Sequence, residues 1–285
     1  MTDGGSGSVG PGVVLGERRG PYAGCLDADL VRRYADATRD PSPAARTGTA
    51  VPPVAIVTQI WDAQNEGRNA VVPEILQRRM TGGVHGEHDV RLLRPIVPGE
   101  PLRIWVEGQG ARPAGRNSLV TLRYTALDAD DTVVAEQWWT TVFLGVTCDP
   151  TGEPAPEHAF PDDARERPAG TYDVEVDADM ARRYAQVSGD WSAHHFELDA
   201  ARVSGFDRLF LHGLCTMALC AQAVVQVVAD GDPDRVRRVA VRFATPTFLG
   251  EQLHVRLYDA GELGYAFEAD SAGATVVTHG RAEVR

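Results

Sequence analysis

The feature that most constrains this chain is an internal repeat. Residues 27–35, Asp-Ala-Asp-Leu-Val-Arg-Arg-Tyr-Ala, recur at an offset of 150 as residues 177–185, Asp-Ala-Asp-Met-Ala-Arg-Arg-Tyr-Ala. From 27 to 45 the copies agree at 9 of 19 positions. Residues 90–102 then match 241–253, and 132–134 match 275–277. A shared helix-start composition explains the first match alone, but not three matches in one order, so the chain is predicted to be a duplication.

Both halves have the same predicted order of elements. A short helix begins at an aspartate cap, at Asp27 or in the region of Asp177, and a loop with Asp40 or Asp190 precedes an apolar helix. Four strands follow, because apolar segments of strand composition alternate with Gly-Glu and similar turns. They are expected at about 89–95, 101–109, 118–127 and 132–145, and at about 236–245, 252–259, 263–270 and 274–284. A repeated antiparallel sheet around a central helix is an α+β fold.

The repeat also divides the chain into predicted units. Residues 1–18 are expected to be a flexible tail, because 1–12 are rich in Gly and Ser and lack the apolar core of a signal peptide. Residues 19–147 form the first unit and 170–285 the second. The intervening 148–169 segment is rich in Pro, Asp and Glu and is predicted to be a surface linker.

Charge and composition exclude several classes of protein. With 28 basic and 40 acidic residues, the net charge of −12 argues against nucleic acid and anionic membranes as partners. No apolar run reaches the roughly 18 residues of a membrane-spanning helix. Four scattered cysteines are too few for a disulfide framework or a Cys-x-x-Cys zinc site. These features predict a reduced, cytoplasmic protein.

The second helix of the C-terminal half, 212–228, is apolar almost all round. Such a helix is expected to be buried on every side, so its N-terminus opens inside the protein. The free backbone N–H groups near Gly213 then form a donor site for a carbonyl oxygen or an anion.

A carboxylate and an imidazole precede this helix and lie five residues apart, at Asp190 and His195. In one loop they can converge on a small molecule and hold a water by one acceptor and one donor, which suits the addition or removal of water. The N-terminus at Gly213 can polarise a carbonyl whose oxygen gains charge when the neighbouring carbon is deprotonated. Asp190 as a turn former and His195 as a packed histidine are the structural alternatives.

The segment Tyr184 to His195, with Gly205-Phe206 and His212-Gly213 after it, resembles the signature of the MaoC-like dehydratase or R-specific enoyl-CoA hydratase 2 family. That signature is Tyr-x-x-x-(Ser/Thr)-Gly-Asp-x-Asn-Pro-(Ile/Leu)-His, followed by Gly-Phe and His-Gly. The resemblance covers about 170–285 strongly and 20–146 weakly. It implies a double hot-dog fold, a degenerate hot-dog at 19–147 and a catalytic hot-dog at 170–285.

The resemblance also assigns roles to residues. It implies that Asp190, His195 and the backbone N–H of Gly213 are catalytic. The residues expected to bind substrate are Ser192, His194, Gly205, Phe206 and His212.

The implied reaction is the reversible hydration of a trans-2-enoyl thioester, of CoA or acyl carrier protein, to an (R)-3-hydroxyacyl thioester. No cofactor and no metal are expected, since adjacent histidines seldom aim both rings at one ion. A homodimer is expected.

Two departures from the signature leave alternatives open. The first half has Ala45 where the second has His195, and Arg39 where the second has Gly189, so Asp40 has no histidine partner. In the second half, Ser192-Ala193 replace Asn-Pro and His194 replaces Ile or Leu. A non-catalytic acyl-thioester-binding or partner subunit is therefore the main alternative, and thioester hydrolysis is a weaker one. The basic run at 235–238 is either a CoA phosphate site or a solvated face.

Overall fold

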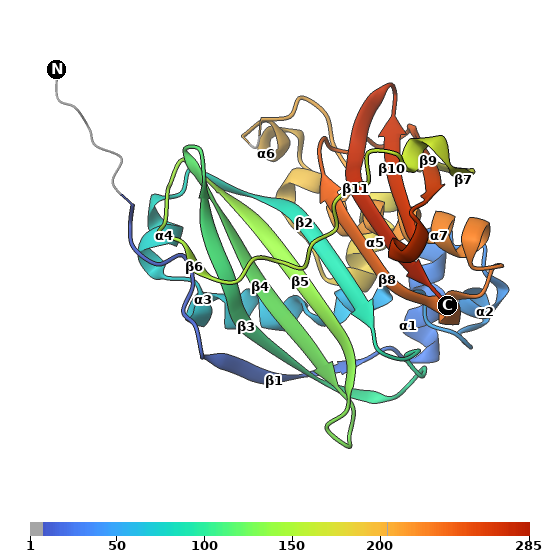
Figure 1. Cartoon of the computed structure of the whole chain (residues 1–285), viewed down its shortest axis with the longest axis horizontal. Coiled ribbons are helices and arrows are strands. Elements are labelled where there is room, and N and C mark those ends of the chain that lie inside the picture. Colours follow the sequence, from blue (N-terminus) through green and yellow to red (C-terminus); the bar gives the residue numbers. More distant parts are fainter. Residues whose placement is uncertain (1–7, 204) are drawn as a thin grey trace.

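The computed structural model describes residues 8–203 and 205–285, and an eleven-stranded sheet forms its framework (Figure 1). The strand order is β1-β3-β4-β5-β2-β8-β11-β10-β9-β7, with the short β6 paired to β3 beside this path. Read from each outer edge inward, the two halves have the same order and meet at β2 and β8. The predicted duplication is therefore visible in the topology.

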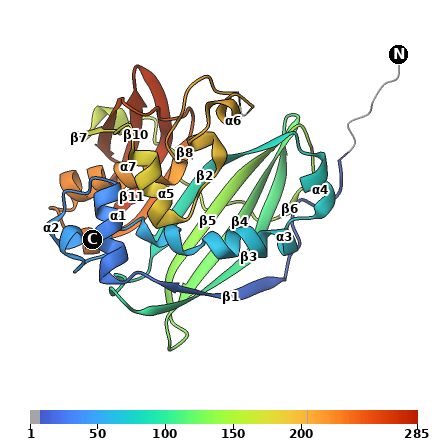
Figure 2. The same ribbon diagram turned by 180° about the vertical axis from the view of Figure 1, so that it is seen from behind.

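The strands of the first half are β1 (Arg18–Cys25), β2 (Gly82–Leu92), β3 (Pro101–Ala114), β4 (Asn117–Leu127), β5 (Val133–Leu144) and β6 (Thr151–Gly152). Those of the second half are β7 (Pro168–Glu175), β8 (Val236–Phe243), β9 (Gln252–Asp259), β10 (Tyr265–Ser271) and β11 (Ala274–Val284). The α-helices are α1 (Ala28–Ala37), α2 (Pro43–Thr47), α3 (Arg68–Val71), α4 (Glu74–Arg79), α5 (Met180–Ser188), α6 (Leu198–Val203) and α7 (Gly213–Val228). Figure 2 shows α1, α3, α5 and α7 in front of the sheet, on the face hidden in Figure 1.

The four strands predicted after the helices of each half are present, as β2 to β5 and β8 to β11. The prediction missed β1 and β7, which precede the first helix of each half. Both are outer strands of the sheet, and most of their residues are exposed or half-buried. Edge strands of this kind lack a clear apolar alternation, so their sequence signal is weak. The strand β2 also starts at Gly82 instead of about 89, because the glycine-rich segment 82–86 continues the ladder with β5 instead of turning.

The central helix α7 confirms the predicted buried helix: its residues from Leu214 to Val225 are all buried. The corresponding single helix of the first half was a wrong prediction. That region divides into α2, a 3-10 helix (Ala55–Gln59), a π turn (Ala63–Gly67), α3 and α4. Pro52, Pro53 and Pro73 lie between these pieces, and proline removes an amide donor and clashes with the preceding turn.

The aspartate caps differ between the halves. Asp27 caps α1 as predicted, since its Oδ1 accepts the amide of Leu30 at 2.7 Å. Asp177 does not cap α5; it forms ion pairs with Arg39 and Arg183. The Arg39 pair therefore links the two halves. Tyr34 and Tyr184 form another contact between them, with tilted rings whose centroids are 6.1 Å apart.

The segment between the halves is attached to the sheet. Its trace crosses the face of the sheet opposite the helices in Figure 1, and Arg238 donates to the carbonyl of Glu157 at 2.9 Å. The buried ring of His158 bonds the carbonyl of His279 at 2.8 Å. Because β7 begins at Pro168, the expected linker end at 169 is two residues late.

The unit boundaries at 19–147 and 170–285 otherwise remain proposals. Of the expected tail 1–18, residues 1–7 lie outside the described residues and β1 already starts at Arg18. None of the helices in the described residues is long and apolar enough to cross a membrane.

The junction of the halves yields a stability prediction. Asp89 in β2 and Arg238 in β8 are buried and paired twice, with Nε–Oδ1 at 3.0 Å and Nη2–Oδ2 at 2.8 Å. Replacing Asp89 by Ala leaves a buried cation short of its partner, so we expect a loss of about 3 kcal/mol in the free energy of unfolding. Urea denaturation measures this. The control Asp29→Ala removes an exposed pair with Arg33 and should change the midpoint little; equal effects of the two variants would contradict the prediction.

Candidate active site

Asp190 lies directly after helix α5, where the chain reverses. Gly189 ends the helix with φ 79°, a left-handed conformation that glycine adopts without strain. The amide and the hydroxyl of Ser192 both donate to Asp190 Oδ1, at 3.0 and 2.5 Å. Ser192 therefore orients the carboxylate of Asp190 through both its amide and its hydroxyl.

His195 is buried and held in one tautomer. Its Nδ1 lies 3.0 Å from the carbonyl of Phe210. Because a carbonyl only accepts, Nδ1 carries the hydrogen and Nε2 presents a lone pair. Burial, and next the neighbouring His212 and His194, lower the pKa of His195 to about 2, so the ring is neutral near pH 7.

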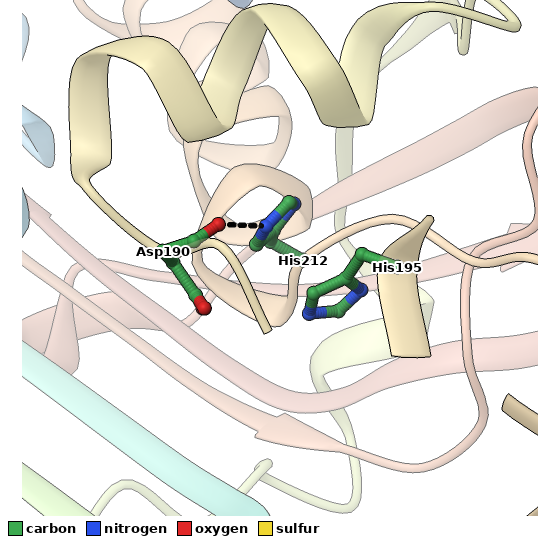
Figure 3. Close-up of side chains that lie close together, drawn as sticks. All are labelled: Asp190, His195 and His212. Carbon is green, nitrogen blue, oxygen red and sulfur yellow. Dashed lines mark hydrogen bonds between the residues drawn. The ribbon is translucent and has the colours of Figure 1, made fainter. Parts of the chain in front are cut away.

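His212 connects the aspartate turn to the start of α7. It is the residue before the helix, and its Nε2 donates to the backbone carbonyl of Asp190 at 3.0 Å (Figure 3). Its ring lies against that of His195, with centroids 3.7 Å apart, and burial lowers its pKa. His212 was predicted to bind substrate; its contacts are those of a residue that positions the other two.

These bonds bring Asp190, His195 and His212 together, with one polar atom of each within 4.8 Å of the others (Figure 3). Such a cluster can be compared with a metal site. Hydrogen bonds engage His195 Nδ1 and His212 Nε2, so the other ring nitrogen of each histidine is the one that could take a proton or a metal ion. The sequence-based expectation of no metal stays a prediction.

Gly213 is the first residue of α7, so its amide is among those without an acceptor inside the helix. A Cβ at this position would lie 3.3 Å from the ring of Phe243, closer than most side-chain contacts. Glycine therefore lets the ring of Phe243 pack against the helix start. His212 precedes Gly213 and bonds the carbonyl of Asp190. The polar cluster and the amide of Gly213 therefore both lie at the N-terminal end of α7.

The other predicted substrate residues are placed at different distances from this cluster. Ser192 and His194 contact it directly, since His194 Nε2 is 3.1 Å from His195 Nε2. Phe206 reaches it through Phe210, with ring centroids 4.8 Å apart. Gly205 is exposed, with φ 92°, and its amide bonds Arg202 in the turn after α6. It shapes that turn and does not join the cluster.

Sequence reasoning missed two contributors to the site. The carbonyl of Phe210 orients His195, but a backbone acceptor has no sequence signal. Trp61 belongs to the first half, and its ring would meet a Cβ on Gly189 at 3.4 Å. Its position depends on how the halves pack, which the repeat alone does not predict.

The basic run at 235–238 favours the structural interpretation. Arg238 is occupied by Asp89 and Glu283, and Arg235 by Asp230 and the carbonyl of Arg285. These two guanidinium groups already have anionic or carbonyl partners, so they hold the fold together. Arg237, the third arginine of the run, bonds the carbonyl of Val236 through Nη1, and its buried Nη2 has no partner among the described residues.

Sequence comparison places the site in a known domain. The model of the MaoC like domain matches residues 161–279. This chain therefore contains a MaoC-like domain in its second half. It is 25% identical over 187 residues to the peroxisomal enoyl-CoA hydratase 2 of Arabidopsis thaliana, covering 62% of this chain and 60% of that protein. It is 27% identical over 197 residues to 3-hydroxyacyl-thioester dehydratase Y of Mycobacterium tuberculosis, covering 67% of each. A 95-residue match to the peroxisomal multifunctional enzyme type 2 of Mus musculus, 35% identical, covers 33% of this chain but 13% of that protein.

Solved structures of the family share the fold. A MaoC-like dehydratase from Phytophthora capsici superposes with a TM-score of 0.80 at 22% identity, over 96% of both chains. A conserved Mycobacterium tuberculosis protein described as a double hot-dog fold superposes with a TM-score of 0.60 at 18% identity, over 96% of this chain and 98% of that one. The predicted double hot-dog fold is confirmed.

The first hot-dog retains the turn of the second but not its histidine. Asp40 Oδ1 accepts the amide of Ser42 at 2.8 Å, as Asp190 accepts that of Ser192. Arg39 adopts a left-handed φ of 56° where Gly189 has 79°. Ala45, at the position of His195, is fully buried. The first hot-dog therefore has the same aspartate turn as the second but lacks the histidine that accompanies Asp190.

The neutral state of His195 predicts a pH dependence of stability. Its pKa is about 2 in the folded protein against an ordinary 6.5, so between these values the unfolded chain binds a proton that the folded protein does not. We expect the free energy of unfolding to fall as the pH is lowered from 7 to 4, and less steeply in His195→Gln. Urea denaturation at several pH values measures the slope. His254→Gln, at an exposed histidine, is the control; identical slopes in wild type and His195→Gln would contradict the prediction.

Proposed function

We propose that this protein is a hydro-lyase that reversibly hydrates a trans-2-enoyl thioester to an (R)-3-hydroxyacyl thioester. The observation that carries the proposal is the fixed pair of Asp190 and neutral His195 at the inner end of α7. The names of the two longer-matching relatives, an enoyl-CoA hydratase 2 and a 3-hydroxyacyl-thioester dehydratase, support the same substrate class.

The roles follow from the tautomer of His195. With Nδ1–H engaged by Phe210, Nε2 carries the lone pair of the ring and is an acceptor, and so is the carboxylate of Asp190. The sequence predicted that one acceptor and one donor hold the water, but Asp190 and His195 Nε2 are both acceptors. A water that donates its two hydrogens to them directs an oxygen lone pair at C3 of the substrate.

Hydration adds water across the C2–C3 double bond of the substrate. The water oxygen bonds to C3 while one of its protons passes to the Asp190–His195 pair, and the electrons of the C2–C3 double bond shift toward the thioester oxygen. The amide of Gly213 stabilises this developing enolate, an effect typically worth about 10²–10³ in rate. A proton from the pair then reaches C2. Either member of the pair can act at C2 in this scheme, and dehydration is the reverse.

The remaining residues are assigned to binding. Ser192 and His212 hold the pair, and we expect His194 and Phe206, with the turn at Gly205, to border the substrate. The first hot-dog is proposed to shape the acyl site, which the contact of Trp61 with Gly189 supports. The thioester carrier is CoA or acyl carrier protein.

Substitutions test this directly. In Asp190→Asn and His195→Gln, an acceptor for the water proton is lost, so each should lower turnover of crotonyl-CoA or longer enoyl thioesters by roughly 10²–10⁴. Hydration is followed by loss of enoyl absorbance. The control is Asp40→Asn, which changes the matching aspartate of the first hot-dog and should keep its activity. Unchanged rates in the two site variants would refute the assignment.

The same assay separates the non-catalytic alternative. A binding or partner subunit would be stabilised against heat by acyl-CoA and hydrate no chain length. The retained Asp190–His195 pair favours the enzyme.

Location and assembly are further proposals. The four cysteines are all free, three of them buried, which supports the reducing cytoplasm as the location. The homodimer stays a prediction, for which light scattering after gel filtration is the measurement.

A further inference from the structure

A second imidazole meets the lone pair of the proposed catalytic histidine. Nε2 of His194 lies 3.1 Å from Nε2 of His195, and the two rings meet edge to face with centroids 4.2 Å apart. His195 Nε2 is the acceptor, because its hydrogen is on Nδ1 and bonded to Phe210. The hydrogen between the two rings therefore belongs to His194.

The ring of His194 is held in this position. It stacks on the ring of Phe210 with centroids 5.3 Å apart and an interplanar angle of 7°. The carbonyl of the same Phe210 fixes His195, so one residue orients both imidazoles. Burial lowers the pKa of His194 and the charge of Asp190 raises it, while His194 in turn lowers the pKa of His195 and of His212.

This contact conflicts with the proposed chemistry unless it opens. His195 Nε2 has one lone pair, and the water to be added must use it. The His194 N–H and the water are therefore competitors for one acceptor. The signature has Ile or Leu at this position, so a side chain without a donor would not compete.

We propose that His194 is a positioning residue that occupies the Nε2 lone pair of His195 in the resting enzyme and must move away before water and substrate bind productively. The inference rests on the proposed hydratase function for its kinetic consequence. Only the fraction of molecules with the lone pair free is competent, so the apparent substrate affinity is reduced by that fraction.

Two variants at the position test the proposal. His194→Leu removes the donor and restores the side-chain type of the signature. His194→Gln keeps an N–H donor but removes the imidazole. The control, His254→Leu, removes a histidine that pairs with Asp173 between β9 and β7. Thermal unfolding shows that each variant is folded.

The first measurement does not depend on activity. Nitrogen-15 NMR of the imidazoles reports whether His195 Nε2 accepts a hydrogen bond, and His195→Gln identifies its signal. We expect the Nε2 resonance to move to the position of a free acceptor in His194→Leu, and to stay near its wild-type position in His254→Leu. An unchanged resonance in a folded His194→Leu would overturn the proposal.

The second measurement is the hydration of enoyl thioesters. Freeing one hydrogen-bonded lone pair should raise kcat/KM in His194→Leu by about two- to tenfold, through a lower KM. His194→Gln should not show this gain, because it retains a donor. A loss of activity in His194→Leu with an intact fold would overturn the competing role, since a supporting residue loses activity when removed.

The two proposals fail in different ways. If the wild type hydrates no enoyl thioester, the hydratase function fails, and the NMR shift alone decides whether His194 occupies the lone pair. If the wild type is active but His194→Leu shows neither the shift nor the lower KM, the function stands and the role of His194 is wrong.

Discussion

The site depends on one constraint: helix α7 is buried along nearly its whole length on one face of the sheet, where it packs against strands of the second half. A helix buried on every side has its N-terminal amides inside the protein, where water does not satisfy them. His212 joins this end to the turn at Asp190, and Gln222, two turns further on, bonds the carbonyl of Thr38 in the first half at 2.8 Å. The helix therefore needs both halves, which explains why the duplicated unit is retained although one copy has lost its histidine.

The parts of the molecule that sequence could predict are those with a local signal. Matching segments in the same order reveal the repeat, a continuous apolar run reveals α7, and the spacing of Asp190 and His195 with the residues around them indicates the candidate site. Each of these depends on side chains close together in the chain. The same local reasoning correctly predicted that Asp27 caps the N-terminus of α1.

Other features depend on packing or on backbone groups, and sequence could not predict them. β1 and β7 are outer strands, so their half-exposed residues carry little alternation. Asp177 pairs with Arg39 of the other half and with Arg183, and the residue before α5 is Asp179. His195 is an acceptor rather than a donor because a backbone carbonyl fifteen residues away takes its hydrogen.

Three imidazoles with lowered pKa values, those of His194, His195 and His212, lie close to Asp190. Burial is the largest cause that lowers the pKa of His194, His195 and His212, and contacts between the rings lower those of His195 and His212 further. In a charged state, two or more of them would repel at ring distances near 4 Å. Neutral rings, by contrast, must share a limited set of donors and acceptors. The carbonyl of Phe210 accepts the hydrogen of His195, and the carbonyl of Asp190 accepts that of His212. Of the three rings, His194 is therefore the one whose hydrogen points at Nε2 of His195. A histidine in place of the signature's Ile or Leu therefore adds a hydrogen-bond donor at the lone pair of the proposed catalytic base.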